Sequence, residues 1–320
     1  MIKIRMAIGI FLFTAALATT AESHSLITVA KDGSGDYTSI QPAINASKAF
    51  PDQRITIKVK NGVYKEKLEI YSWNTKISLI GESKEATIVT YDDYFGKIRY
   101  GRNSTFHTYT VKISGNDAYL RDLTIVNSSG PVGQAVALHI EADRVYLDNI
   151  AIKGFQDTVY LGGEGHRSYF KNCYIEGSVD FIFGAGTALF ENCEIKSLSN
   201  GFITAASTPI DQEFGLTFKY CRLTALPSVK QAYLGRPWRR YARTAFINSE
   251  LGAHIHPDGW HNWDNTQNEK TAFYAEYGNV GAGKYSTARV KWARQLGRES
   301  AAKYTAAKIF RNWNYQATMQ

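Results

Sequence analysis

The chain has 320 residues, 44% of them hydrophobic, and a formal net charge of +8. This length allows one or two domains with a large core. The basic residues are spread along the chain without a dense Lys/Arg block, which argues against nucleic-acid binding, and no segment after the N-terminus is long and apolar enough to span a membrane.

The first 21 residues predict a secretory signal peptide. Lys3 and Arg5 precede an apolar stretch over residues 7–18, and small residues follow up to Ala21, as in peptides that direct export. Cleavage after Ala21 leaves 35 basic and 29 acidic residues, so the formal net charge falls to +6. We therefore expect a secreted mature protein, residues 22–320, located outside the cell or in the periplasm of a Gram-negative bacterium.

The segment TSIQPAINA, residues 38–46, predicts a short helix near the mature N-terminus. Ile40 and Ile44 have helical spacing, and Thr38 or Ser39 is a suitable N-cap,. The preceding KDGSGDY lacks the Lys-Ser/Thr ending of a phosphate-binding loop, so we interpret it as a turn. The helix would shield the open start of the fold.

One eight-residue pattern recurs six times between residues 118 and 251. Each copy has a large apolar residue at its third and eighth positions and a small or apolar residue at its sixth. Strand-forming residues with Gly and Asn at the turns indicate β-structure. The copies are AYLRDLTI at 118, VYLDNIAI at 145, SYFKNCYI at 168, ALFENCEI at 188, LTFKYCRL at 216 and TAFINSEL at 244.

The spacing of these copies, 20 to 28 residues, is too short for repeats of helical hairpins,. It predicts an all-β, single-domain, right-handed parallel β-helix with one coil per repeat, in which like residues stack in the core. The stretch from His254 to Asn268, rich in Gly, Asn and Trp, predicts an ordered loop. Residues 300–310, SAAKYTAAKIF, predict a further short helix that packs along the outside or closes the last coil.

Two cysteines occupy the sixth position of consecutive repeats. Cys173 and Cys193 would stack about 4.8 Å apart, the distance between neighbouring strands, and this lies within the range of a disulfide. We therefore predict a Cys173–Cys193 bond in the exported protein and expect Cys221, one coil later, to be a small buried residue. Three cysteines without a grouped histidine make a metal site a poor alternative.

The same frame brings two aspartates together. Asp157, in GFQDTVYL, and Asp180, in GSVDFIFG, each follow the start of their repeat by twelve residues. Gln134 precedes Asp157 by the same 23 residues that separate the aspartates, so we predict a column of Gln134, Asp157 and Asp180. Two carboxyl groups at strand distance favour one protonated acid beside one carboxylate, which suits an acid and a nucleophile.

Arg236, in YLGRPWRR, lies eight residues before its next repeat, as Asp180 does, but two coils away. If its guanidinium extends back along the face, it would keep Asp180 ionised through charge-assisted hydrogen bonds. A polar ladder that only satisfies the surface of a β-helix is the alternative. It explains poorly why glutamine, two aspartates and arginine converge.

With these residues in place, the sequence resembles the pectin methylesterase (pectinesterase) family. The resemblance covers about residues 28–293 and rests on GSGDYTSIQPAI, NGVYKEKLEI, GQAVAL, GFQDTVYL, GSVDFIFG, LGRPW and HPDGWHNW, in that order. It implies an enzyme that removes methyl esters from pectin (homogalacturonan), releases methanol and needs no cofactor. Because a β-helix with closed ends can work alone, we expect a monomer, and the charge and hydropathy patterns predict neither nucleic acid nor a membrane as a partner.

The resemblance also assigns roles by position. It places the nucleophile on Asp180, the general acid and base on Asp157, and the arginine that orients the carboxylate on Arg236. It assigns the oxyanion-binding amides to Gln134 and Gln156. Three aromatic residues would line the sugar cleft: Tyr160, Phe183 and Trp238.

Some features fit this picture less simply. Strict strand alternation would place Gln156 on the face opposite Asp157, so its role needs a bend in the backbone. His254, His256 and His261 invite a zinc hypothesis, but scattered histidines in a Trp-rich loop favour a structural or sugar-binding role, and we predict no metal site.

Two other functions remain as alternatives. A pectin lyase or polygalacturonase also uses a β-helix, but it would require a calcium-binding carboxylate cluster, a lone arginine base or more paired carboxylates. A noncatalytic polysaccharide-binding solenoid would keep Trp238, Trp260 and Trp263 and lose the aspartate pair. This sequence has both the aspartates and the tryptophans.

Overall fold

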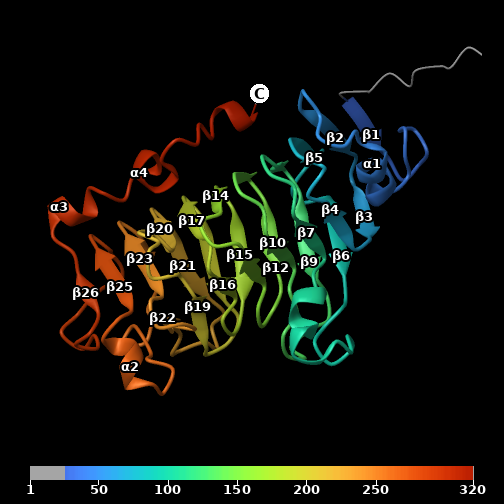
Figure 1. Ribbon diagram of the computed structural model, residues 1–320. Helices are drawn as coiled ribbons and strands as arrows, with labels where there is room; N and C mark the ends of the chain where they lie inside the picture. Colours follow the sequence, from blue (N-terminus) through green and yellow to red (C-terminus); the bar gives the residue numbers. More distant parts are fainter. Residues whose placement is uncertain (1–25, 320) are drawn as a thin grey trace, which may run out of the picture.

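The computed structural model describes residues 26–319, so the predicted signal peptide lies outside the described residues. Parallel strands form three long sheets that wind into the predicted right-handed β-helix (Figure 1). Between residues 55 and 251 the chain passes in turn through the first, third and second sheets. Within residues 26–319, no helix has the length and apolar character needed to cross a membrane.

Within each sheet, neighbouring strands lie side by side in the following order. The first sheet contains β1 (Leu26–Val29), β2 (Ile55–Val59), β5 (Ile77–Gly81), β8 (Tyr119–Arg121), β11 (Val145–Asp148), β14 (Arg167–Lys171), β17 (Thr187–Glu191), β20 (Leu216–Lys219), β23 (Arg243–Ile247), β25 (Phe273–Tyr277) and β26 (Arg294–Gln295). The second contains β22 (Tyr233–Gly235), β19 (Phe202–Ala206), β16 (Ile182–Gly184), β13 (Val159–Leu161), β10 (Leu138–Ile140), β7 (Val111–Ile113) and β4 (Leu68–Ile70). The third contains β24 (Glu250–Leu251), β21 (Arg222–Ala225), β18 (Glu194–Ser197), β15 (Tyr174–Gly177), β12 (Ala151–Lys153), β9 (Thr124–Asn127), β6 (Thr87–Tyr91) and β3 (Gly62–Lys65).

The helices are short and lie at the ends or outside the sheets (Figure 1). The predicted N-terminal helix is α1, with Ile40 and Ile44 buried as expected. Its cap differs from the prediction: Ser39 is the N-cap residue but makes no side-chain hydrogen bond. Instead, the carboxylate of Glu66 accepts from the N–H groups of Ile40 and Gln41, both at 2.9 Å, so a neighbouring coil satisfies the helix start,. The helical segments are α1 (Ile40–Ala46), η1 (Gly101–His107), α2 (Thr266–Glu269), α3 (Arg298–Ala301), α4 (Ala306–Phe310) and η2 (Ala317–Met319).

Each of the six repeats supplies one strand of the first sheet and one of the third. Its third residue points into the core, where Phe170, Phe190, Phe218 and Phe246 form a column with successive ring centroids 4.5 Å apart. These four rings are fully buried. Stacking of like residues in successive coils therefore builds the core, as the repeats predict.

The fifth residue of every repeat turns the chain from the first sheet to the third. All six have left-handed backbone, with φ between 49° and 56°, a region that Asn and Asp adopt more readily than other side chains,. This turn explains why the repeats keep their register although the coils differ in length. The six residues are Asp122, Asn149, Asn172, Asn192, Tyr220 and Asn248.

The predicted Cys173–Cys193 disulfide is not formed in the structure. Cys173, Cys193 and Cys221 are buried free thiols at matching positions of three successive coils. Side chains at in-register positions of parallel strands point the same way, so the sulfur atoms stack instead of facing each other. Each thiol instead has a backbone carbonyl of the preceding coil within hydrogen-bonding distance, as Cys221 has that of Phe190 at 3.3 Å. Burial raises the pKa of Cys193 well above its usual value and keeps this thiol protonated,.

The C-terminal end of the solenoid is closed by a buried ion pair. Arg289 donates to Glu276 at 2.8 Å, and both side chains are almost completely buried. The indole N–H of Trp260 also donates to Glu276, at 3.2 Å. Trp260 is only 1% exposed, so it belongs to the core and not to a sugar-binding surface.

The segment predicted as one helix over residues 300–310 forms two short helices, α3 and α4. It runs back along the outside of the solenoid (Figure 1). There Phe310 packs on Tyr169 of the first sheet, with ring centroids 5.4 Å apart, and Tyr315 packs on the same ring at 4.9 Å. The C-terminal segment, residues 298–319, thus covers the outer face of the first sheet.

Candidate active site

Asp157 and Asp180 precede neighbouring strands of the second sheet. Strands β13 and β16 pair in parallel with Val159 beside Ile182, so the two aspartates are in register, each two residues earlier. Both have left-handed backbone, with φ of 65° and 50°. This conformation ends the turn before each strand and sets both side chains on the same face. They are 8% and 6% exposed, so the carboxyl groups lie side by side and largely out of water.

Arg236 follows β22, two strands beyond β16, and its side chain reaches back to Asp180. Its Nε donates to Oδ1 at 2.8 Å and its Nη2 to Oδ2 at 2.7 Å, which makes a bidentate ion pair,. The chain can approach β19 this closely because residue 235 is glycine: a Cβ there would collide with Thr204. The structure therefore brings together the arginine and the aspartate that the repeat frame paired.

Two aromatic rings enclose the guanidinium of Arg236. Its central carbon lies 3.9 Å from the ring centroid of Phe202 and 3.7 Å from that of Trp263. Stacking between two rings restricts the guanidinium plane and strengthens its placement through cation–π attraction. The sequence reasoning considered Trp263 only as a sugar-binding residue and missed Phe202. Phe202 follows Asp180 by one coil in the same register, because Thr204 pairs with Ile182, and this relationship could have identified it.

Burial raises the pKa of both aspartates, but unequally. The pKa of Asp157 is raised well above its usual value by burial and then by the neighbouring charge of Asp180, with only partial relief from Arg236. Burial also raises the pKa of Asp180, but the hydrogen bonds and charge of Arg236 oppose this effect directly. Asp157 is therefore the group that keeps the proton, and Asp180 is the group that ionises first.

Gln134 and Gln156 lie side by side in an isolated parallel bridge. The predicted column of Gln134, Asp157 and Asp180 is therefore wrong. Leu138 pairs with Val159, so the chain from Gln134 to Leu138 contains one residue more than the chain from Gln156 to Val159. This extra residue moves Gln134 next to Gln156. The left-handed turn at Asp157 is the bend that the sequence could not reveal, and it breaks the strict alternation of faces,.

The aromatic residues assigned to the cleft cluster beside the acid pair. Tyr160 and Phe183 are neighbours in register on β13 and β16, with ring centroids 4.9 Å apart. Trp238 lies 5.9 Å from Phe183, and Phe106 lies 4.9 Å from Tyr160 on the other side. Together they form an aromatic wall on the outer face of the second sheet, where sugar rings can pack.

The histidines of the Trp-rich loop support loop structure. Nδ1 of His256 accepts from the N–H of Asp258 at 3.1 Å, and Nδ1 of His261 accepts from the N–H of Trp263 at 3.0 Å. The loop is ordered as predicted and contains α2. Among residues 26–319, no group of three or more His, Cys, Asp or Glu side chains is arranged to hold a metal ion.

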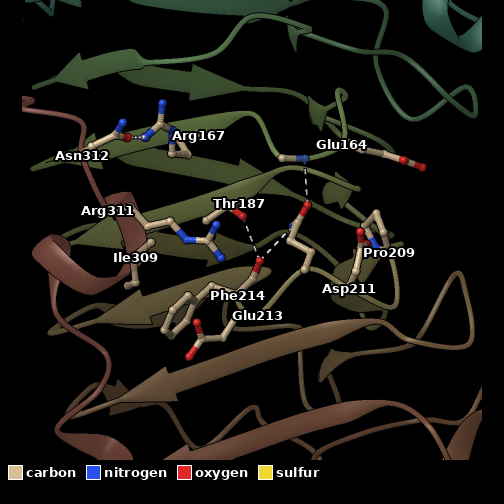
Figure 2. A pocket seen from close by; sticks show the side chains of 12 residues that line it. Glu164, Arg167, Thr187, Pro209, Asp211, Glu213, Phe214, Ile309, Arg311 and Asn312 are labelled. Atoms are coloured by element: carbon tan, nitrogen blue, oxygen red, sulfur yellow. Dashed lines mark hydrogen bonds between the residues drawn. The ribbon is translucent and has the colours of Figure 1, made fainter.

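A separate cavity of about 440 Å³ lies between the first sheet and the C-terminal segment (Figure 2). On its wall Arg167 donates to the carbonyl oxygen of Phe310 at 2.7 Å and to Asn312 at 3.1 Å. None of the five candidate catalytic residues lines this cavity. It is therefore distinct from the acid pair on the second sheet. Its lining includes Glu164, Thr187, Asp211, Glu213, Phe214 and Arg311.

Comparison with known proteins identifies the family of this chain. Residues 26–312 match the family model described as Pectinesterase. Pectinesterase 31 of Arabidopsis thaliana is 39% identical over 279 residues, which cover 85% of this chain and 87% of that protein. Probable pectinesterase/pectinesterase inhibitor 6 of the same plant is 40% identical over 282 residues, 86% of this chain but 49% of the relative. The chain thus spans about half the length of several relatives.

Solved structures agree with the fold. The pectin methylesterase from carrot superposes with a TM-score of 0.86 at 29% identity, covering 96% of this chain and 98% of that one. The pectin methylesterase from Erwinia chrysanthemi gives a TM-score of 0.77 at 30% identity, with 92% and 98% covered. A pectin methylesterase in complex with a hexasaccharide gives 0.78 at 31% identity, with 90% and 97% covered.

Proposed function

The chain belongs to the pectinesterase family and is a carboxylic ester hydrolase that demethylesterifies pectin; from this premise we propose that Asp180 is its nucleophile and Asp157 its general acid and base. The observation that carries the proposal is the asymmetry of the buried pair. Arg236 holds Asp180 by two hydrogen bonds, while Asp157, beside it, has the more strongly raised pKa.

In the first half of the reaction, an oxygen of the Asp180 carboxylate attacks the carbonyl carbon of a methyl-esterified galacturonate unit. Arg236 aims that carboxylate and contacts both its oxygens. The amides of Gln134 and Gln156 stabilise the oxyanion that forms. The bond to the methoxy group then breaks, and Asp157 donates its proton to the departing methanol. An anhydride between Asp180 and the sugar carboxyl group remains.

In the second half, a water molecule resolves this intermediate. Asp157, now a carboxylate, takes a proton from the water, whose oxygen attacks the sugar acyl carbon. The bond to Asp180 breaks, which restores its carboxylate and the protonated Asp157. The net reaction consumes one water and yields methanol and one free galacturonate carboxyl group. All proton transfers are carried by the chain's own residues, so the proposal requires no cofactor.

The substrate in this proposal is methylated homogalacturonan, packed against Tyr160, Phe183 and Trp238 on the aromatic wall. Export of the mature chain, residues 22–320, gives access to pectin outside the cell. We further propose that the protein acts as a monomer, since α1 covers one end of the solenoid and residues 290–293 pack against the core at the other,.

The test is a product assay on highly methylated pectin that follows methanol, new reducing ends and unsaturated uronate together. The proposal predicts methanol alone. New chain ends would indicate a polygalacturonase, and unsaturated uronate would indicate a lyase. Asp180→Asn should leave pectin binding intact and reduce kcat by about 10³-fold or more. Appreciable turnover by this variant would assign the nucleophile elsewhere, and circular dichroism would check that the variant folds.

A further inference from the structure

Three large aromatic residues lie close together at the surface near the N-terminal end of the second sheet. The rings of Tyr71 and Trp73 stack with centroids 4.7 Å apart and an interplanar angle of 12°. Trp73 is 45% exposed and Phe50 is 70% exposed. The N–H of Phe50 donates to the carbonyl oxygen of Trp73 at 2.7 Å, so the two residues are neighbours. We call these three residues the distal platform.

The grouping of these residues distinguishes them from ordinary exposed apolar side chains. Single exposed apolar side chains are normal, whereas contiguous exposed apolar patches mark interaction sites and ligand-binding grooves. Phe50 also has a left-handed backbone, with φ of 47°, which is unusual for a bulky side chain,. The fold thus holds a phenylalanine at the surface in a conformation that glycine or asparagine would adopt more easily.

The distal platform continues the face that carries the aspartate pair. Tyr71 directly follows β4, the last strand of the second sheet. Glu69 and Tyr71 are partly exposed, and Ile70 between them is buried, so Tyr71 points outward. Glu69 lies in one row of in-register residues with Lys112, His139 and Tyr160 on the next three strands, and Tyr160 belongs to the aromatic wall.

The distance between the two regions suits a polymer. Four strand spacings separate β4 from β16 in the sheet order, which corresponds to about 19 Å across the strands. Asp180 lies three residues before Phe183, and Tyr71 lies two residues after Glu69 in the same register row, so the two regions are also offset by five residues along the strands. A ligand that touches both the platform and Asp180 must therefore contain several sugar units. A short fragment bound at Asp180 does not reach Trp73.

The charges of Glu141 and Lys112 along this path are paired with each other, so neither is offered freely to a carboxylate of the polymer. Glu141 lies 3.3 Å from Lys112 between the two regions, and its pKa is lowered to about 2, first by its interaction with His139. An uncharged stretch of the polymer leaves this ion pair undisturbed. Beside the platform, Lys76 donates to the carbonyl oxygens of Pro51 and Asp52.

We propose that Phe50, Tyr71 and Trp73 form a distal subsite for methyl-esterified units of the same pectin chain whose ester lies at Asp180. The inference rests on the proposed function. The apolar C–H faces of neutral sugar units pack against the exposed rings, which removes apolar surface from water. A chain held at both places gains affinity because the second contact is intramolecular. The subsite therefore selects long, highly methylated chains.

The test compares Trp73→Ala with the unmodified protein on long, highly methylated pectin and on a methylated trigalacturonate. On long pectin we expect KM to rise about tenfold with kcat unchanged, the effect of truncating an interfacial tryptophan. On the trimer, both constants should stay the same. Trp73→Phe should restore part of the affinity. The increase in KM should become smaller as the pectin is de-esterified beforehand.

Tyr220→Asn is the matched control. Tyr220 is 51% exposed and lies at a repeat turn between the first and third sheets, where four other coils carry asparagine. Its replacement should leave KM on both substrates unchanged. Equal kinetics of Trp73→Ala and the unmodified protein on long pectin would overturn the subsite, as would an equal loss on the trimer.

The subsite and the proposed function fail in different ways. If the unmodified protein releases no methanol, the proposed function is wrong. Calorimetric titration with methylated oligogalacturonides of increasing length then still tests the platform. Affinity that increases with length in the unmodified protein and not in Trp73→Ala supports the subsite, and identical affinities for the two proteins reject it.

Discussion

Phe202 lies in register with Asp180 on the next coil, and its ring forms one side of the clamp around the arginine that holds this aspartate. The position of the carboxylate therefore depends on a residue that makes no hydrogen bond to it. Charge alone would attract Arg236 to Asp180, but the two rings restrict the plane in which the guanidinium can lie.

We expect Phe202→Leu to lower kcat about tenfold and to change KM little, because misplacing a reacting group costs mainly in the transition state. Methanol release on pectin measures both constants. Tyr233→Phe is the control, since it keeps the ring that stacks on Phe202, 5.4 Å away. An unchanged kcat in Phe202→Leu would show that the ion pair holds its geometry without the clamp.

The pH dependence of kcat should follow the two aspartates. Activity requires Asp180 ionised and Asp157 protonated. The rate should rise with pH as Asp180 loses its proton and fall as Asp157 loses its own. Burial raises the pKa of both groups. The pH range of activity should therefore lie above the usual pKa range of aspartate. The two apparent pKa values read from the profile describe the coupled pair and not the individual residues.

Methanol release measured across pH tests this dependence. In Asp157→Asn, the small remaining activity should lose the decline at high pH, because the group that causes it is absent. A decline that persists in this variant would assign the acid to another residue.

Asp157 should also reduce the stability of the fold at neutral pH. Its folded-state pKa is raised, so the folded protein binds its proton more tightly than the unfolded chain does. The resulting free-energy cost is absent below the unfolded pKa and grows as pH increases above it. Asp157→Asn removes this free-energy cost. It should therefore raise Tm at pH 7 by about 2–4 °C for each kcal/mol of the cost removed, and should have little effect on Tm near pH 3.

Calorimetry at both pH values measures this difference. Asp264→Asn, at a side chain 94% exposed, should leave Tm unchanged at either pH and serves as the control. A lower Tm of Asp157→Asn at pH 7 would show that the carboxyl group stabilises the fold.

The buried pair of Arg289 and Glu276 makes a contrasting prediction. Arg289→Ala leaves the Glu276 carboxylate buried without its main partner and should lower the free energy of unfolding by about 3–5 kcal/mol in urea titrations. Lys48→Ala breaks an exposed pair with Asp52 and should cost less than about 1 kcal/mol. Similar losses in the two variants would mean that the buried pair contributes little to closing the solenoid.

Much of the architecture could be predicted because equivalent positions of successive repeats stack on each other in the core. The column of Phe170, Phe190 and Phe218 is visible in the sequence as a recurring third position. The register of Asp157 with Asp180 follows from the same count. Arg236 could be placed because two coils lie within reach of a long side chain.

The errors arose where the chain leaves the regular frame. One extra residue after Gln134 moves it beside Gln156, and a count of residues cannot reveal such a bulge. The Cys173–Cys193 distance suited a disulfide, but the parallel direction of the side chains did not. Glu66, on a neighbouring coil, caps the first helix in place of Ser39, a tertiary contact with no local signal.

The C-terminal segment changes how the solenoid holds together. In a simple solenoid each coil contacts only its neighbours, so coils can open one after another from an end. Here Arg167 binds the carbonyl oxygen of Phe310, 143 residues later, and Tyr315 packs on both Tyr146 and Tyr169. Residues 310–315 therefore fasten central coils to each other, and this fastening forms only after this segment has been synthesised. The protein should unfold as a single cooperative unit and not coil by coil.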